Sequence, residues 1–328
     1  MLETPSENQK QMLRAANEIA ASRALFARVT RRSDSVILPL NPSAADPEAQ
    51  GPALFCIHSI VGAGVTDFLA LARRLAGSVR VFGVQAPPQR MKEPSFGASV
   101  TALADSYASA VAAAHPGGPI VVAGWSAGAA IALAVAHALR ARGREVALLV
   151  AIDGAPEIPS ADLHPWDPRY WIVMGGNLPK WFAACRATEK GFPASAFRRW
   201  SRSHLTRLQQ VLARRTTEVA PKLERSVSLD RFPPEQRQFM ARLYDAIMCY
   251  VPDPWDGPVV LYEARALNPT QYLQRWRSVA PQAELAPLDA THVTILHEPQ
   301  VAKLARDLHR RIAEAVTAPG EPDHAAGS

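Results

Sequence analysis

The feature that most constrains this chain is an alternation of short apolar runs and longer amphipathic stretches, which begins at Ala53. The apolar runs are predicted to be strands, and they lie at residues 53–58, 79–85, 119–125, 146–153, 258–264 and 283–288. Apolar positions at helical spacing follow them, at residues 66–77, 100–115, 127–143 and 298–316. Strands that are apolar on both faces and alternate with helices indicate a mostly parallel sheet covered on both sides, which is a doubly wound α/β fold.

Three other segments have a different character. Residues 1–50 carry an amphipathic helical pattern followed by a linker rich in Pro, Asp and Ser. Residues 157–248 form a mostly helical stretch of roughly ninety residues between two strands, far longer than an ordinary connection. We interpret this stretch as a lid inserted into a single α/β domain that spans residues 51–316. Residues 317–328 have the composition of a disordered tail.

Bulk composition argues against several classes of protein. The 328 residues are 48% apolar and 20% charged, which is typical of a globular fold. A net charge of +6 is modest for this length, so nucleic acid is not an expected partner. The three cysteines are far apart, which predicts neither a disulfide framework nor a metal site. The first residues show no basic region followed by an apolar run, and no apolar run is long enough to span a membrane. We therefore expect neither export nor membrane insertion, and a cytoplasmic protein.

A G-x-S-x-G motif, Gly124-Trp125-Ser126-Ala127-Gly128, stands directly between an apolar strand and an Ala-rich helix. This context is typical of a nucleophile elbow, a turn so tight that its neighbours must be small and the serine hydroxyl is exposed above the sheet. The positive end of the following helix also favours a developing oxyanion. The motif therefore predicts Ser126 as a catalytic nucleophile and the backbone N–H of Ala127 as one oxyanion donor.

A serine nucleophile needs a histidine base and an acid that orients it. His292 lies in the loop between the last expected strand and the last expected helix, where this fold carries its base, and His297 is its nearest rival. Two acids end suitable strands: Asp153 after the nucleophile helix and Glu263 one strand later. Either acid could reach the base, and we favour Asp153 with Glu263 as the alternative.

The second oxyanion donor is expected in the loop after the first apolar strand, residues 58–64. This loop contains Gly62 and Gly64, which permit close approach of the backbone. The backbone N–H of Ile60 is the predicted donor.

Four ordered segments, FCIHSIVGAG, FGVQAP, AGWSAGAAIA and THVTILHEP, resemble the motifs of one family. The chain is similar over about residues 50–316 to the type I thioesterase domains of nonribosomal peptide and polyketide synthases, which belong to the α/β-hydrolase superfamily. In that family the acid follows the strand after the nucleophile helix, so the resemblance favours Asp153. The sequence departs from the family pattern where His58-Ser59 replaces the usual His-Pro and bulkier residues follow. The departure falls in the segment that would carry the second oxyanion donor, so it bears on the assignment of the Ile60 N–H to that role.

The resemblance implies a substrate delivered as a thioester on the phosphopantetheine arm of an acyl or peptidyl carrier protein, with no cofactor of its own. An acyl-enzyme on Ser126 would then be captured by water or by an internal nucleophile, giving hydrolysis or cyclisation. Such domains usually end a multidomain enzyme, whereas no carrier or condensation domain is recognisable here before the α/β domain. We expect the protein to act in trans, with its N-terminal helix either docked to a partner or packed on its own domain.

Two other functions remain open at this stage. One is a carboxylesterase or amidase that acts on free small molecules with the same three residues. The other is an inactive hydrolase-fold binding protein, although such proteins commonly lose one member of the triad. The acyl chain, the oligomeric state and the cognate carrier protein are not predicted.

Overall fold

The computed structural model describes residues 35–46, 48–60, 65–157, 232–264, 270–292 and 294–317. Its centre is a seven-stranded sheet with the order β1-β3-β2-β4-β5-β6-β7. The strands are β1 (Ile37–Pro39), β2 (Ala53–Ile57), β3 (Arg80–Val84), β4 (Ile120–Trp125), β5 (Val146–Ile152), β6 (Val259–Ala264) and β7 (Glu284–Leu288). Only β1 runs antiparallel to its neighbour. The expected α/β-hydrolase fold, with its mostly parallel central sheet, is confirmed.

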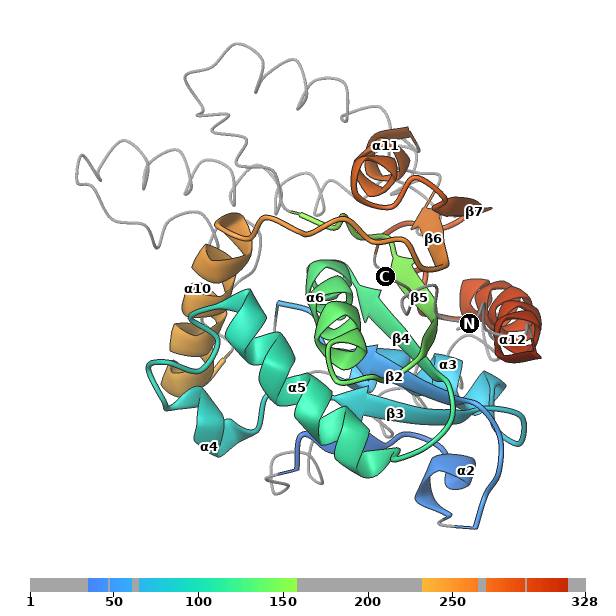
Figure 1. Cartoon of the computed structure of the whole chain (residues 1–328), viewed down its shortest axis with the longest axis horizontal. Coiled ribbons are helices and arrows are strands. Elements are labelled where there is room, and N and C mark those ends of the chain that lie inside the picture. Colours follow the sequence, from blue (N-terminus) through green and yellow to red (C-terminus); the bar gives the residue numbers. More distant parts are fainter. Residues whose placement is uncertain are drawn as a thin grey trace, which may run out of the picture. The chain divides into compact units, whose positions relative to one another are not determined.

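The strands alternate with helices in the described part of the chain (Figure 1). These are α2 (Pro42–Ala45), the 3-10 turn η1 (Thr66–Phe68), α3 (Leu69–Arg74), α4 (Pro88–Met91), α5 (Val100–Ala114), α6 (Gly128–Arg140), α10 (Pro234–Met248), α11 (Thr270–Val279) and α12 (Gln300–Thr317). Helices α5 and α6 share one buried apolar cluster with the sheet, and α3 and α12 share the other. The two pairs therefore cover opposite faces, as a doubly wound sheet requires.

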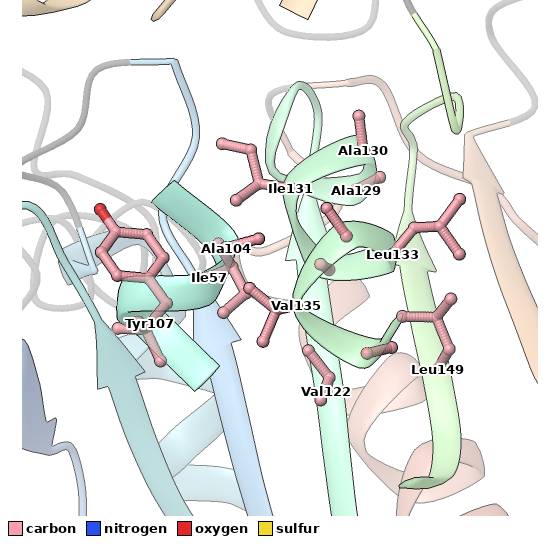
Figure 2. Packing of buried hydrophobic residues seen from close by; sticks show 14 of the residues in the cluster. Ile57, Ala104, Tyr107, Val122, Ala129, Ala130, Ile131, Leu133, Val135 and Leu149 are labelled. Atoms are coloured by element: carbon pink, nitrogen blue, oxygen red, sulfur yellow. The ribbon is translucent and has the colours of Figure 1, made fainter. Parts of the chain in front are cut away.

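Alternation of side chains along each strand divides the core between these two faces. On β2, Phe55 and Ile57 point into the cluster under α5 and α6, whereas Leu54 and Cys56 point into the cluster under α3 and α12. Figure 2 shows the first cluster, in which residues of α6 pack between the strands and α5. Every residue of α6 from 128 to 136 is buried. Small alanine side chains permit this close packing on several sides.

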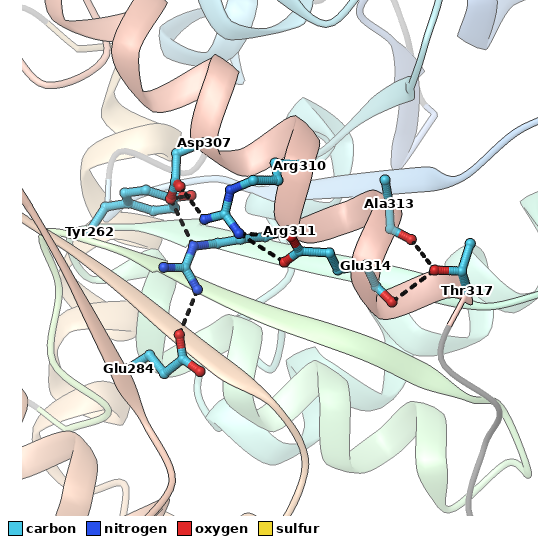
Figure 3. Close-up of polar contacts among 8 residues, drawn as sticks. All are labelled: Tyr262, Glu284, Asp307, Arg310, Arg311, Ala313, Glu314 and Thr317. Carbon is cyan, nitrogen blue, oxygen red and sulfur yellow. Dashed lines mark hydrogen bonds and ion pairs between the residues drawn. The ribbon is translucent and has the colours of Figure 1, made fainter.

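Helix α12 is attached to β6 and β7 by a polar network around Asp307 (Figure 3). The Asp307 carboxylate accepts hydrogen bonds from the Tyr262 hydroxyl at 2.9 Å and from Arg311 at 2.7 Å. Arg311 also pairs with Glu284 at 2.7 Å. Burial disfavours the charge on Asp307, but hydrogen bonds from Arg311, Arg310 and Tyr262 outweigh it and lower the pKa of Asp307. This network fixes the helix that follows the loop after β7.

The chain divides by its internal contacts into two compact units, Met1–Ile158 with Gln238–Ser328, and Pro159–Arg237. The sheet belongs to the first unit, and so does α10 from Gln238 onward, although the sequence had assigned this helix to the lid. The expected N-terminal helix, most of the lid and the tail lie outside the described residues, so these assignments stay predictions. None of the described helices is both long and apolar enough to span a membrane.

One strand was not expected from the sequence. Strand β1 pairs with β3, and the side chain of Asn41, two residues after the strand ends, joins three segments. Its amide donates to the carbonyls of Ala72 and Val79, and its oxygen accepts from the N–H of Ala44 at the start of α2. Asn41 is 6% exposed. The segment before β2, which the sequence suggested was a linker, is therefore fastened to the sheet by a buried amide.

We predict that Asn41→Ala lowers the free energy of unfolding by about 2 to 3 kcal/mol, because it leaves buried backbone groups without partners. Urea denaturation followed by circular dichroism measures the change. Ser43→Ala is the control, since its hydroxyl accepts one exposed hydrogen bond from Gly77. Equal effects of the two substitutions would contradict the importance of the buried amide.

Candidate active site

Ser126 stands at a sharp turn between β4 and α6, with a φ of +57°. A residue other than glycine rarely adopts this conformation. The turn depends on three glycines: a Cβ on Gly124 would overlap the backbone of Gly128, and a Cβ on Gly154 would overlap the backbone of Ser126. A Cβ on Gly128 would lie 2.7 Å from the carbonyl oxygen of His58. The local sequence therefore folds into a nucleophile elbow because its neighbours lack side chains.

The structure brings three of the predicted site residues into a hydrogen-bonded row. His292 Nε2 lies 3.1 Å from Ser126 Oγ, and His292 Nδ1 lies 2.6 Å from Asp153 Oδ2. A carboxylate can only accept, so Nδ1–H donates to Asp153 and Nε2 is left to accept from the serine hydroxyl. This arrangement can remove a proton from Ser126 and hold it on the imidazole.

Asp153 follows β5 and is itself held in place. It is fully buried and has a φ of +46°. Its Oδ1 accepts a hydrogen bond of 2.9 Å from the N–H of Ala264, and its own N–H donates to the carbonyl of Tyr262. The backbone of β6 thus orients the carboxylate toward His292, which is what an orienting acid requires.

Trp125, the residue before the predicted nucleophile, contacts His292 in two ways. Its ring stacks on the imidazole with centroids 5.2 Å apart and an angle of 26° between the planes. Its indole N–H donates to the backbone carbonyl of His292 at 3.2 Å. Nothing in the sequence indicates a role for Trp125, because a residue at a variable position of the motif carries no spacing signal. In the structure Trp125 contacts His292, the predicted base, from one side.

Glu263, the alternative acid, lies on β6 beside Asp153 but makes no hydrogen bond to His292 in the described residues. Its side chain is 1% exposed, and neither carboxyl oxygen has a hydrogen-bond partner within the described part of the chain. Burial raises the pKa of Glu263 to about 7, and the nearby charge of Asp153 adds to the shift. The backbone N–H of Tyr272 faces the carboxyl group without making a hydrogen bond of ordinary geometry, and its smaller effect lowers the pKa. The carboxyl group of Glu263, which is partly protonated near pH 7, therefore lies beside Asp153 without joining the hydrogen bonds between Asp153, His292 and Ser126.

The two predicted oxyanion donors belong to two segments that meet at Gly128. Ala127 precedes the first residue of α6, and Ile60 lies in the loop after β2, whose carbonyl at His58 packs on Gly128. Among the described residues, neither the Ile60 nor the Ala127 N–H donates a hydrogen bond. Residues 61–64, including both expected glycines of this loop, lie outside the described part. The described residues contain no group of three or more His, Cys, Asp or Glu side chains suited to a metal ion.

The parallel sheet, the elbow after β4 and the histidine after β7 define an α/β-hydrolase. Residues 52–172 match the thioesterase domain family. The chain therefore carries a thioesterase domain related to those of nonribosomal peptide and polyketide synthases, and the resemblance inferred from its motifs is confirmed.

Among curated proteins, microperfuranone synthase of Emericella nidulans is 37% identical over 109 residues, which are 33% of this chain and 11% of that protein. Enterobactin synthase component F of Escherichia coli K12 is 33% identical over 129 residues, which are 39% of this chain and 9% of that protein. The matches thus cover only about a tenth of each of these relatives.

Solved structures show the same fold. The thioesterase domain of NocB, in covalent complex with a fluorophosphonate nocardicin G analog, aligns with a TM-score of 0.55 and 18% identity over 84% of this chain and 99% of its own. The four-domain nonribosomal peptide synthetase AB3403 aligns with a TM-score of 0.55 and 20% identity over 88% of this chain and 21% of its own. At these identities the likeness concerns the fold.

The buried Glu263 generates a prediction about stability. Its folded pKa is raised from 4.5 to about 7, so the folded state holds this proton more tightly than the unfolded chain does. The contribution to stability is complete below pH 4.5 and is lost as the pH rises through about 7. Between pH 4.5 and about 7 we expect the loss of this contribution to lower the free energy of unfolding by up to about 3 kcal/mol.

Glu263→Gln removes the titration while keeping the shape of the side chain, so its pH profile is expected to be flatter than that of the wild type. Urea denaturation between pH 4.5 and 8 measures both profiles. Glu284→Gln serves as the control, because that carboxylate is exposed and paired with Arg311. Parallel profiles for the wild type and Glu263→Gln would show that Glu263 titrates normally.

Proposed function

We propose that this protein releases an acyl, peptidyl or polyketide chain from the phosphopantetheine thioester of a carrier protein, through an acyl-enzyme on Ser126. The observation that carries the proposal is the hydrogen-bonded row of Ser126, His292 and Asp153 in a chain that contains a thioesterase domain. Hydrolysis and cyclisation share the first half of this reaction, and both remain possible products of the second half.

In the first half, His292 Nε2 accepts the hydroxyl proton as Ser126 Oγ attacks the thioester carbonyl carbon. Asp153 keeps the imidazole in the required tautomer and stabilises the imidazolium that forms. The carbonyl oxygen becomes an oxyanion, for which the N–H groups of Ile60 and Ala127 are the proposed donors. The intermediate collapses, the carbon–sulfur bond breaks, and the imidazolium gives its proton to the leaving sulfur. The products are the acyl-serine ester and the free pantetheine thiol.

In the second half, water or a nucleophile within the acyl chain attacks the ester carbonyl, and His292 accepts its proton. Collapse of the second oxyanion breaks the bond to Ser126 Oγ, which regains a proton from the imidazolium. Attack by water gives a carboxylic acid, and attack from within the chain gives a ring. Both routes need the same three side chains.

Asp153 is assigned as the acid because its carboxylate contacts His292 at 2.6 Å. Glu263 lacks this hydrogen bond, and its raised pKa leaves it partly neutral near pH 7. A neutral carboxyl group would stabilise an imidazolium less than a carboxylate does. Glu263 is therefore proposed as a buried neighbour of the acid.

The carrier protein is proposed from the relatives, two of which are named as synthases and one as a nonribosomal peptide synthetase. We also propose that the reaction takes place in the cytoplasm. This is consistent with Cys56 and Cys249, the two cysteines in the described residues, which are both free thiols. The insertion that the sequence predicts between β5 and β6 is proposed to act as a lid.

We predict that a fluorophosphonate adds to the wild type and not to Ser126→Ala, because the reagent needs an activated serine. Asp153→Asn is expected to slow labelling by at least about 100-fold, since the imidazole loses its orienting acceptor. Glu263→Gln is the matched control and is expected to label within about threefold of the wild type. Intact mass spectrometry follows the adduct.

Two outcomes would contradict this assignment. An unlabelled wild type would argue against an activated Ser126. A Glu263→Gln variant slowed as much as Asp153→Asn would instead make Glu263 the acid or a necessary part of it.

The substrate class has its own test. We predict that kcat/KM for an acyl thioester on a holo carrier protein exceeds that for the same acyl group on a free ester by at least about 100-fold, because carrier contacts add binding energy. Product release is followed by mass spectrometry, with Ser126→Ala as the blank. Faster turnover of the free ester would favour a carboxylesterase. If the protein is labelled by the fluorophosphonate but turns over neither substrate, the thioesterase proposal is wrong.

A further inference from the structure

His58, the residue after β2, is a fully buried polar side chain that the proposed mechanism does not use. Both ring nitrogens have partners: Nδ1 lies 2.6 Å from the carbonyl oxygen of Ser59, and Nε2 lies 2.6 Å from the hydroxyl of Tyr107. Tyr107, which is labelled on α5 in Figure 2, meets the imidazole edge-on at 5.6 Å. Phe239 of α10 covers the ring from another side at 6.2 Å. The imidazole is thus held in one orientation inside an apolar wall.

The direction of each hydrogen bond follows from chemistry. The carbonyl of Ser59 can only accept, so Nδ1 of His58 carries the proton. Burial lowers the pKa of His58 to about 4, which leaves the ring neutral at physiological pH and makes Nε2 an acceptor. Burial raises the pKa of Tyr107, so its hydroxyl keeps the proton that it donates. The chain of donors therefore runs from Tyr107 through His58 to the Ser59 carbonyl.

This carbonyl belongs to the same peptide group as the N–H of Ile60. A trans peptide is planar, so its C=O and N–H point in opposite directions. When His58 holds the carbonyl on its own side, the Ile60 N–H is turned to the other side. The loop also lies against the elbow, because the His58 carbonyl packs on Gly128, the residue after Ala127.

We propose that His58 is a positioning residue: braced by Tyr107, it orients the Ser59–Ile60 peptide so that the Ile60 N–H can act as the second oxyanion donor. The inference rests on the acyl-enzyme mechanism proposed above. It gives a physical basis for an oxyanion loop in which Ser59 and Ile60 stand where smaller or more rigid residues are usual in the family. The orientation comes from a side-chain hydrogen bond to the carbonyl.

Two substitutions of His58 separate positioning from simple space filling. In His58→Asn the side-chain amide nitrogen can take the place of Nδ1 and donate to the Ser59 carbonyl. In His58→Gln the amide lies at the distance of Nε2, so it can meet Tyr107 but is displaced from that carbonyl. We expect kcat to fall about 10- to 100-fold in His58→Gln and less than about fivefold in His58→Asn, with KM within about twofold in both.

His115→Gln is the matched control. His115 is also a buried histidine, and burial is the main cause of its lowered pKa. It contacts Arg80 at the start of β3, at the end of the sheet opposite to Ser126. Its substitution is expected to cost stability while leaving kcat within about twofold. Cooperative thermal unfolding checks the fold of each variant.

The second-order rate of fluorophosphonate labelling provides a readout that needs no carrier substrate, because the phosphonyl oxygen takes the place of the oxyanion. The labelling rate is expected to follow the order of kcat, so that His58→Gln is labelled more slowly than His58→Asn. If the wild type is labelled but does not release carrier-bound chains, the proposed function fails while the role of His58 is still tested by labelling.

Tyr107→Phe removes only the brace and is expected to slow labelling about three- to tenfold, and it supplies the test if His58→Gln does not fold. The inference is overturned if His58→Gln and His58→Asn are labelled at equal rates, or if His115→Gln is slowed as much as His58→Gln. It is also overturned if a folded Tyr107→Phe variant is labelled at the rate of the wild type.

Discussion

The close approach of backbone at the nucleophile elbow is the constraint on which the rest of the site depends. Gly124, Gly128 and Gly154 are places where any Cβ would collide with backbone or with a neighbouring side chain. Their absence of side chains lets β4, α6 and the turn after β5 meet at one point. Ser126 and Asp153 both have positive φ there, so two strained residues are maintained by the surrounding parallel sheet. A site built on such contacts tolerates little displacement, which suits groups that must stay within hydrogen-bond reach.

Much of this arrangement could be predicted because buried parallel strands are continuous apolar runs. The six strands expected from the sequence begin and end within about one residue of those observed. Ser126 and His292 could be located because a strand-turn-helix context and the order of elements restrict where such residues stand. The choice between Asp153 and Glu263 could not be made from spacing, since both end neighbouring strands. Only the direction of each side chain separates them, and that direction depends on hydrogen bonds from the backbone of β6.

Other features had no signal in the sequence because they join segments that are distant along the chain. Strand β1 is three residues long, and it pairs with β3 some forty residues later. The contact of Trp125 with His292 joins residues 167 positions apart, and His58 meets Tyr107 across 49 positions. Neither hydrophobic periodicity nor local propensity can predict such pairs of residues. The last two of these contacts involve His292 and the loop after β2, so interactions that the sequence does not reveal lie close to the proposed site.

The position of His292 along the chain has a consequence for biosynthesis. Ser126 and Asp153 lie in the first half of the sequence, whereas the base comes from a loop near the C-terminal end of the domain, 166 residues after the serine. A nascent chain that has emerged only as far as β5 contains the proposed nucleophile and acid but not the proposed base. On the proposed mechanism, the three side chains can meet only after β7 has joined the sheet, so a ribosome-bound or truncated chain is expected to be inactive.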